Sequence, residues 1–355
     1  MSGERLTGLD LARALAILGM ILVNYKLAMA AENGGPSWLV ELAGVLEGRA
    51  SALFVMLAGI GFSLMTRRAR LGEPGELQKS RILVWKRSLY LLLLGFGLLL
   101  LGWSADILHY YALFLFMASF LIQASTRLLT GLAALLLALS QGLLLLLDYR
   151  TGWDPSFHAY LDFWSAEGFL RNLWFNGYHP VLPWFAFFLA GMAAGRWPLN
   201  ETAVRRKALV MGLAAGLGAE GLAWLLRTGL NAELGGEAAD YLFGTKPMPP
   251  GLFYMISAGG TAVAVIALCL DAADQFRARL PVRALVPAGQ MALTHYVLHV
   301  LAGLGFLELL GVLENGSLPF ALLYGAGFFA GAVLFSLAWQ QRFGRGPLEA
   351  LMRKL

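Results

Sequence analysis

Charged residues are scarce in this chain: Asp, Glu, Lys and Arg make up 14% of its 355 residues, whereas 58% are hydrophobic. A soluble domain carries roughly 25% charged residues. The composition therefore excludes an ordinary soluble domain and indicates a chain that crosses a membrane repeatedly. The net charge of +5 does not indicate nucleic-acid binding, because Lys and Arg in cytoplasmic loops orient membrane helices and attract anionic lipid headgroups.

Cysteine is nearly absent as well. The single Cys269 lies in an apolar run, so one chain holds no disulfide framework, and we interpret this residue as a small buried hydrophobe. The sequence also lacks a Walker phosphate loop, a serine elbow and an HExxH pattern. His295 and His299 have the i, i+4 spacing of helical metal ligands, but no Cys or acidic residue accompanies them, so no metal is expected.

Long apolar segments are abundant. A helix that crosses ~30 Å of hydrocarbon needs roughly 20 apolar residues. We therefore predict an all-α, polytopic bundle, one domain over residues 1–355, with an aromatic-rich external loop at 148–177 that lies at headgroup depth. The predicted spans are 9–31, 50–66, 85–103, 106–125, 128–147, 178–196, 207–228, 251–271, 287–310 and 319–340.

Positive charge alternates between the gaps that separate these spans. Of the 27 Lys and Arg residues, 20 fall in every second gap or at the two ends, and 5 fall in the other gaps. This distribution predicts a polytopic inner-membrane protein with both termini in the cytoplasm. The first span could instead be a cleaved signal peptide, but Asp10, Arg13, Asn24 and Lys26 in or beside it favour a retained helix.

Several polar residues lie inside the predicted spans, where they are costly. Asp10 and Arg13, at i, i+3, either pair with each other or face a substrate. Asn24 needs hydrogen-bond partners if it is buried. Small residues spaced four apart indicate close helix packing. These pairs are Gly191/Gly195, Gly212/Gly216 and Gly327/Gly331.

Two histidines lie at the predicted external ends of helices. His109 follows Asp106 by three residues, and His179 precedes Pro180 and Pro183, which fix the backbone where the chain enters the bilayer. A neutral histidine is a suitable general base, and a neighbouring carboxylate would orient it. A packing role at the membrane interface is the alternative for each histidine.

Short motifs in order along nearly the whole chain resemble the transmembrane acyltransferases related to heparan-α-glucosaminide N-acetyltransferase, and more specifically their bacterial branch. The N-terminal motif, RLTGLDLAR at 5–13, continues into Val23-Asn24-Tyr25. The other motifs are at 48–54 with 58–61, 106–111, 176–184 with Gly191 and Gly195-Arg196, 289–294 with Tyr296, and 343–349.

The resemblance implies acyl transfer across the membrane. A cytosolic acyl-CoA, acetyl-CoA or a similar thioester, would acylate a hydroxyl or amino group of a glycan or lipid-linked acceptor on the external side. The heparan enzymes place their catalytic histidine in the first external loop, but residues 26–38 contain no histidine here. That role therefore cannot be carried over, and His109 or His179 would take its place.

The expected site follows from these considerations. His179 or His109 would remove the acceptor proton, Asp106 would orient the base, and Asn24 or Arg49 would stabilise the oxyanion. Direct attack and an acyl-histidine intermediate both stay open. Asp10 and Arg13 would line the path of the pantetheine arm. The cations expected to bind donor phosphates, each of which could instead only set topology, are Arg81, Lys86, Arg87, Arg205 and Arg206.

Membrane lipids and a glycan or glycolipid acceptor are the expected partners, nucleic acid is not expected, and a homodimer is allowed. The alternative function is a transporter or lipid-handling protein without catalysis. The apolar bulk of the chain, the intramembrane Glu220 and the lack of a complete catalytic constellation would fit that alternative.

Overall fold

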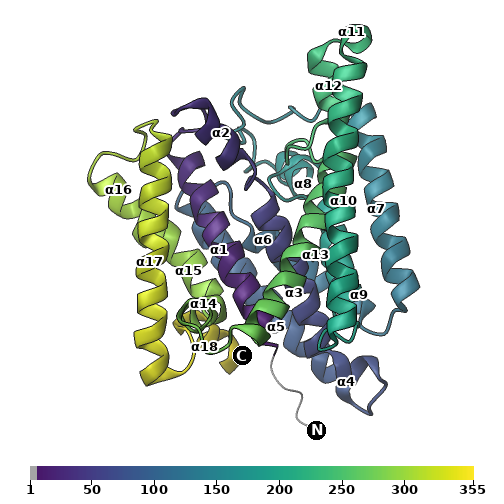
Figure 1. The fold of residues 1–355 in the computed structure, drawn as a ribbon, viewed down its shortest axis with the longest axis vertical. Helices are drawn as coiled ribbons and strands as arrows, with labels where there is room; N and C mark the ends of the chain where they lie inside the picture. Colours follow the sequence, from purple (N-terminus) through teal and green to yellow (C-terminus); the bar gives the residue numbers. More distant parts are fainter. Residues whose placement is uncertain (1–5) are drawn as a thin grey trace. The chain divides into compact units, whose positions relative to one another are not determined.

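The computed structural model describes residues 6–355, and Figure 1 shows these residues folded into helices joined by loops. Within this part of the chain there is no β-strand, and one isolated bridge pairs Trp153 with Tyr160. Arg5, which begins the N-terminal motif, lies outside the described residues. The all-α prediction is confirmed.

The helices follow one another with short connections, apart from the segment between α7 and α8. Two of the elements, η2 and η3, are π-helices, and η1 is a 3₁₀ turn. The elements are α1 (Thr7–Ala28), α2 (Ser37–Gly44), α3 (Arg49–Met65), α4 (Arg67–Arg70), α5 (Glu76–Leu100), α6 (Leu108–Ala118), η1 (Ser119–Leu121), α7 (Thr126–Leu146), α8 (Ala166–Arg171), η2 (Asn172–Asn176), α9 (Val181–Ala194), α10 (Thr202–Gly229), α11 (Asn231–Leu234), α12 (Gly236–Phe243), α13 (Leu252–Gln275), α14 (Leu280–Gln290), α15 (Ala292–Leu298), η3 (His299–Leu304), α16 (Gly305–Leu309), α17 (Leu318–Phe343) and α18 (Pro347–Lys354).

Eight helical stretches among the described residues are long and apolar enough to cross a membrane. The predicted fourth and sixth spans correspond instead to shorter apolar helices, Leu108–Leu121 and Val181–Ala194. The chain is therefore a multi-pass membrane protein, as predicted, but the number ten is not confirmed. The two short helices are also the ones that begin beside His109 and His179.

The described chain divides into two compact units. The first unit comprises residues 6–54, 199–209 and 262–354, and the second comprises 55–198, 210–261 and Leu355. Helices α3, α10 and α13 contribute one part to each unit. A single domain over the whole chain stays a prediction.

In the first unit, α1 packs against α14 and α17 (Figure 1). One face of α1 is buried almost completely, with Ile17, Ile21 and Tyr25 each no more than 1% exposed. Gly289 permits the approach of α14, because a Cβ at this position would overlap the Asp10 carbonyl group. Close backbone contact of this kind is how membrane helices gain packing energy without a hydrophobic drive between them.

In the second unit, α5 packs against α6 and α7 packs against α9. The predicted small-residue pairs have different outcomes. Gly191 and Gly195 lie against α3, and Gly260 of α13 faces Gly212 and Gly216 of α10, so two of the three predictions are confirmed. In the first unit, Gly327 and Gly331 would admit a Cβ with nothing within 4 Å, so the third pair does not mark close packing within this chain. A small residue permits close packing but does not require it.

Candidate active site

The second unit holds a buried carboxylate–histidine pair at the start of α6. Asp106 Oδ2 accepts hydrogen bonds from the backbone N–H of His109 at 3.0 Å and from His109 Nδ1 at 2.8 Å. Both side chains are at most 1% exposed. A carboxylate can only accept, so Nδ1 carries the proton and Nε2 presents its lone pair. This arrangement is that of an oriented general base.

A glycine of the neighbouring helix makes room for this pair. A Cβ on Gly95 of α5 would lie 2.6 Å from Asp106 Oδ2 and 2.6 Å from the His109 backbone nitrogen. Real Cβ atoms do not approach other atoms that closely, so any side chain at position 95 would displace the pair. The absence of a side chain at Gly95 therefore allows α5 to close directly over the carboxylate.

Tyr110 connects the two predicted catalytic histidines. Its ring centroid lies 3.9 Å from that of His109 and 5.9 Å from that of His179. The ring of His179 in turn lies edge-on to Trp184, at 4.6 Å. Tyr110 is held in place because its hydroxyl donates to Asn172 Oδ1 at 2.5 Å. The structure thus brings His109 and His179 within 6 Å of the same tyrosine ring.

Three ring nitrogens in this cluster have no hydrogen-bond partner among the described residues. They are His109 Nε2, His179 Nδ1 and Trp184 Nε1, and each atom is buried. Buried polar atoms are bonded in the great majority of cases, so three orphans on adjacent rings call for an explanation. One explanation is that their partners are polar groups of a substrate.

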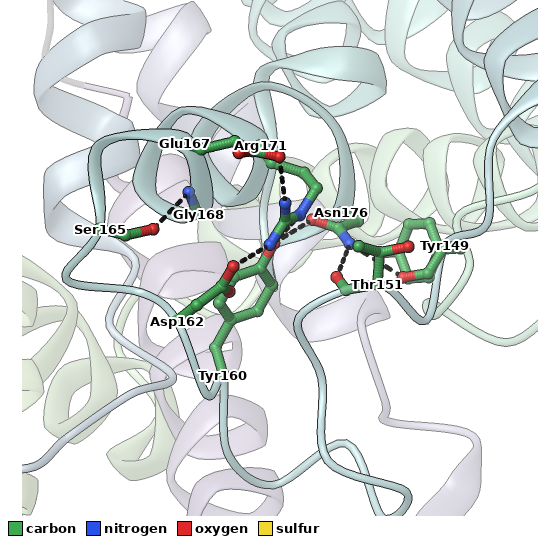
Figure 2. Close-up of polar contacts among 9 residues, drawn as sticks. All are labelled: Tyr149, Thr151, Tyr160, Asp162, Ser165, Glu167, Gly168, Arg171 and Asn176. Atoms are coloured by element: carbon green, nitrogen blue, oxygen red, sulfur yellow. Dashed lines mark hydrogen bonds and ion pairs between the residues drawn. The ribbon is translucent and has the colours of Figure 1, made fainter.

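The segment between α7 and α9 is a folded cap with its own hydrogen-bond network (Figure 2). The Asn176 amide donates to the carbonyl groups of Tyr149 at 2.9 Å and Thr151 at 2.7 Å, and its oxygen accepts from the Tyr160 hydroxyl at 2.7 Å. Burial raises the pKa of Tyr160, which keeps this hydroxyl protonated as a donor. Asn176 therefore joins three points of one loop.

Arg171 supplies a second set of bonds within the cap. Its Nε donates to the Tyr160 hydroxyl at 2.9 Å, and its terminal nitrogens pair with Asp162 at 2.5 Å and Glu167 at 3.3 Å (Figure 2). Its guanidinium also lies 5.7 Å from the centre of the Tyr160 ring. These contacts fix the half of the cap that precedes η2.

The aromatic side chains of the cap pack largely inside the protein. Trp153, Tyr160 and Phe163 are 7–8% exposed and form one cluster with Leu99 of α5. The Phe163 ring lies 6.3 Å from the His109 ring, so the cap lies over the histidine. The sequence predicted these aromatics at headgroup depth. The hydrogen-bonded loop folds these three rings against α5, and the depth of the loop in the membrane stays a prediction. Trp164 stays 64% exposed.

In the first unit, the predicted donor-binding pair Asp10 and Arg13 forms an ion pair of 2.5 Å. Asp10 Oδ2 also accepts from Gln290 Nε2 at 3.1 Å, and Gln290 accepts from Gln340 at 2.8 Å. These bonds join α1, α14 and α17. They favour the pairing interpretation of Asp10 and Arg13, and their donor-binding role stays a prediction.

Asn24 has a partner that sequence reasoning missed. His299 Nδ1 donates to the Tyr296 carbonyl group, so His299 Nε2 is the acceptor and receives a hydrogen bond from Asn24 Nδ2 at 2.9 Å. His299 begins η3, and π-helices often occur at functional sites. The only signal in the sequence was that a buried amide and a buried histidine each need a partner.

The two histidines with i, i+4 spacing have different partners. His295 Nε2 lies 2.6 Å from Ser336 Oγ, whereas His299 contacts Asn24. No group of three or more His, Cys, Asp or Glu side chains within residues 6–355 could hold a metal ion.

Arg205 is removed from the expected set of phosphate-binding cations. Its side chain is 4% exposed and pairs with Asp274 at 2.5 Å and Asp271 at 3.3 Å within the first unit. The carboxylates already neutralise its charge, so the expectation was wrong for this residue. Arg206 and Lys86 are exposed.

The remaining predicted cations have mainly neutral contacts. Arg49 donates to the Val45 carbonyl group at 3.3 Å in the first unit. In the second unit, Arg81 donates to the Ser119 carbonyl group at 3.3 Å, and Arg87 contacts Met65 Sδ at 2.6 Å. Donor binding by all three stays a prediction.

Comparisons with known proteins agree with this picture. The sequence profile of the heparan-α-glucosaminide N-acetyltransferase catalytic domain matches residues 5–231. The chain belongs to this family. A second profile, that of a protein family of unknown function called DUF418, matches residues 198–355. The uncharacterized protein YeiB of Escherichia coli K12 is 26% identical over 399 aligned positions, which cover 99% of this chain and 96% of YeiB.

Membership of the heparan-α-glucosaminide N-acetyltransferase family supports a membrane acyltransferase-type function. The matched region contains Asn24, Asp106, His109 and His179. The resemblance drawn from the motifs is thereby confirmed at the level of the family.

Proposed function

We propose that this protein is an acyltransferase of the bacterial inner membrane. It transfers an acyl group, acetyl in the simplest case, from cytosolic acyl-CoA to a hydroxyl or amino group of a glycan or lipid-linked acceptor on the external side. The observation that carries the proposal is the buried Asp106–His109 pair, whose unpartnered Nε2 belongs to the same cluster of rings as two further orphaned nitrogens. A base oriented in this way is what an acceptor O–H or N–H requires.

In the proposed reaction, His109 Nε2 removes the proton as the acceptor oxygen or nitrogen attacks the thioester carbonyl carbon. Asp106 stabilises the imidazolium that forms, because it already holds Nδ1–H. When the tetrahedral intermediate collapses, the carbon–sulfur bond breaks and His109 returns the proton to the leaving sulfur. The products are the acylated acceptor and free CoA.

His179 provides the second polar group of this site. Its orphaned Nδ1 would hydrogen-bond the acceptor and hold it beside His109. A two-step route, in which a histidine first takes the acyl group, uses the same residues. Acid quenching of the enzyme with labelled donor alone separates the routes, because only the two-step route leaves label on the protein.

The decisive experiment is transfer of radiolabel from acetyl-CoA to membrane glycolipids by the purified protein. We expect His109→Gln to lower the rate by about 10²–10⁴-fold, the usual contribution of a general base. His158→Gln, in the cap but outside the histidine cluster, is the matched control. Equal rates for the His109→Gln variant and the wild type would reject this site. A wild type that neither binds nor uses acetyl-CoA would reject the function.

The sidedness of the proposal has its own test. Phosphatase fusions should be active after residues 160 and 240 and inactive after residues 75 and 202, as the charge distribution predicts. The reverse pattern would place the histidine cluster and its cap on the cytoplasmic side.

The transporter alternative loses one of its three supporting observations. That observation was Glu220, a carboxylate within a predicted span. In the structure this carboxylate accepts hydrogen bonds from Ser257 Oγ at 2.5 Å and Thr245 Oγ1 at 2.9 Å. A carboxylate bonded in this way joins α10, α13 and the loop before α13, which is a structural role.

A further inference from the structure

Two arginines that no sequence pattern singled out as a site lie together in the second unit. Arg70 ends α4, directly beyond α3, and Arg196 follows the end of α9. Helices α3 and α9 cross with almost no side-chain volume between them. A Cβ on Gly195 would lie 2.9 Å from the Ser63 Cβ and 3.0 Å from the Ile60 carbonyl oxygen. This close crossing causes the two helix ends to emerge side by side.

The two guanidinium groups are unusual in their surroundings. Each has a buried Nε without a hydrogen-bond partner, and no carboxylate of residues 6–355 pairs with either. Burial lowers the pKa of Arg196, and the charge of Arg70 lowers it further. Burial and the charge of Arg67 do the same to the pKa of Arg70. Like charges have thus been gathered and partly desolvated without a counter-charge.

Arg68 shows that the same helix can satisfy an arginine in the ordinary way. It lies two residues before Arg70 in α4, it is exposed, and its Nε pairs with Glu73 at 2.6 Å. The lack of a carboxylate at Arg70 and Arg196 therefore does not follow from a shortage of acidic residues near α4.

The start of α7 adds a further positive element. Arg196 donates to the Thr126 hydroxyl at 3.1 Å, and Thr126 is the first residue of this 21-residue helix. The first backbone N–H groups of a helix carry partial positive charge and bind anions readily. Arg196 thus reaches this helix N-terminus directly. Arg70 lies close to it as well, because the Gln123 amide just before α7 donates to the carbonyl group of the preceding Ala69 at 3.3 Å.

We propose that Arg70, Arg196 and the first turn of α7 form a binding site for a phosphate group. The planar guanidinium binds phosphate through two parallel hydrogen bonds, and the orphaned Nε atoms are the donors that such an anion would use. If the proposed function holds, the phosphate belongs to the nucleotide end of acyl-CoA. An anionic phospholipid headgroup offers the same chemistry.

The test compares Arg70→Gln and Arg196→Gln with Arg68→Gln, which removes the same charge from α4. Binding of CoA and of pantetheine, which lacks the nucleotide phosphates, is measured in nanodiscs of neutral lipid. Retention of phosphatidylglycerol is measured by native mass spectrometry. Arg70→Lys and Arg196→Lys keep the charge but lose the planar fork, and thermal unfolding confirms that each variant is folded.

If the phosphate is that of the donor, Arg70→Gln and Arg196→Gln weaken CoA binding about tenfold or more, the loss of one charge-assisted contact. In that case pantetheine binding by these two variants is unchanged, and Arg68→Gln binds CoA as the wild type does. If the phosphate is that of a lipid, CoA binding is unchanged and phosphatidylglycerol retention falls in the same two variants. The proposal is overturned if neither ligand responds, or if Arg68→Gln has the same effect.

These outcomes separate the phosphate site from the proposed function. A wild type that binds and uses acetyl-CoA, with both glutamine variants unchanged for both ligands, rejects the phosphate site and leaves acyl transfer standing. A wild type that does not bind CoA rejects acyl transfer, and the lipid measurement alone then decides the phosphate site.

Discussion

Asp106 and His109 form a pair in which one carboxylate oxygen receives both the backbone N–H and the ring Nδ1–H of the histidine. The contact fixes the tautomer as well as the orientation of the ring, because an ionised carboxylate has no proton to offer. An asparagine amide at position 106 could donate a proton in a hydrogen bond to Nδ1, and the ring could then adopt the other tautomer. The hydrogen bond therefore determines which nitrogen of His109 can act as a base.

The first prediction follows from this tautomer. Asp106→Asn can donate to Nδ1 and so favours a proton on Nε2, which removes the base. We expect kcat for acyl transfer to fall by about 10²–10⁴-fold with KM little changed. In a His109→Ala background the same substitution should have no further effect. Asp148→Asn, which replaces an exposed carboxylate, serves as control, and additive losses in the double variant would contradict the pairing.

The second prediction concerns the glycine beside this pair. Gly95→Ala would place a methyl group 2.6 Å from Asp106 Oδ2, whereas Gly97→Ala on the same helix meets nothing within 4 Å. We expect Gly95→Ala to cost about 1–3 kcal/mol of stability through overpacking, and to lower activity. Gly97→Ala should leave both unchanged. Thermal unfolding and label transfer measure the two effects, and identical behaviour of the variants would show that the pair tolerates displacement.

The third prediction separates two roles of Asn24. As a partner of His299 it contributes roughly 1 kcal/mol, the usual value of a hydrogen bond between membrane helices. As an oxyanion donor it would contribute about 10²–10³-fold to kcat. Asn24→Ala and His299→Ala should therefore have similar thermal unfolding temperatures, and only Asn24→Ala should lose that much activity. Similar activity losses in the two variants would show that Asn24 acts only as the hydrogen-bond partner of His299.

Contacts between residues that are close in the chain could be predicted from the sequence. Contacts between residues that are far apart in the chain could not. The Asp106–His109 pair has i, i+3 spacing, and the helical periodicity brings such residues together. The contact between Asn24 and His299 spans 275 residues. The approach of Arg70 to Arg196 requires the α3–α9 crossing. Neither of these two contacts can be recognised from neighbouring residues in the sequence. A polar residue in a membrane span needs a partner, but the sequence does not indicate which residue that partner is.

The predicted count of ten spans is not confirmed, for a related reason. Hydropathy detected all the apolar segments, but the segments at α6 and α9 are shorter as helices than as apolar runs. In both cases the polar residues that precede the helix, Asp106 and His179 among them, are held in the protein interior. Burial within the protein replaces the length that lipid would otherwise demand.

The fourth prediction concerns the cap. Asn176→Ala removes two donors and one acceptor, and leaves the carbonyl groups of Tyr149 and Thr151 without this amide. An unsatisfied buried group costs about 1–3 kcal/mol. We expect faster limited proteolysis within 148–177 and lower activity, because the cap that covers His109 loosens. Asn200→Ala, at an exposed position, is the control. Unchanged proteolysis would mean that the aromatic cluster alone holds the cap.

The last prediction uses Glu349, which attaches the C-terminal helix α18 to α15. Its carboxylate accepts from the Thr294 backbone N–H at 3.0 Å and from the Thr294 hydroxyl at 2.6 Å. Burial raises the pKa of Glu349 above its usual 4.5 and outweighs these bonds, which lower it. Above pH 4.5 the unfolded carboxyl group has lost its proton while the folded one keeps it. Stability from this residue is therefore fully present at low pH and is lost as pH rises through the folded pKa.

Glu349→Gln stays neutral throughout this range. We expect its thermal unfolding temperature, relative to that of the wild type, to increase as pH rises from 4.5 to about 7.5. Glu308→Gln replaces an exposed carboxylate and should follow the wild type at every pH. A constant difference between Glu349→Gln and the wild type would show that the two bonds from Thr294 compensate the burial of the charge. In that case α18 would be attached equally well whether the Glu349 carboxyl group is protonated or ionised.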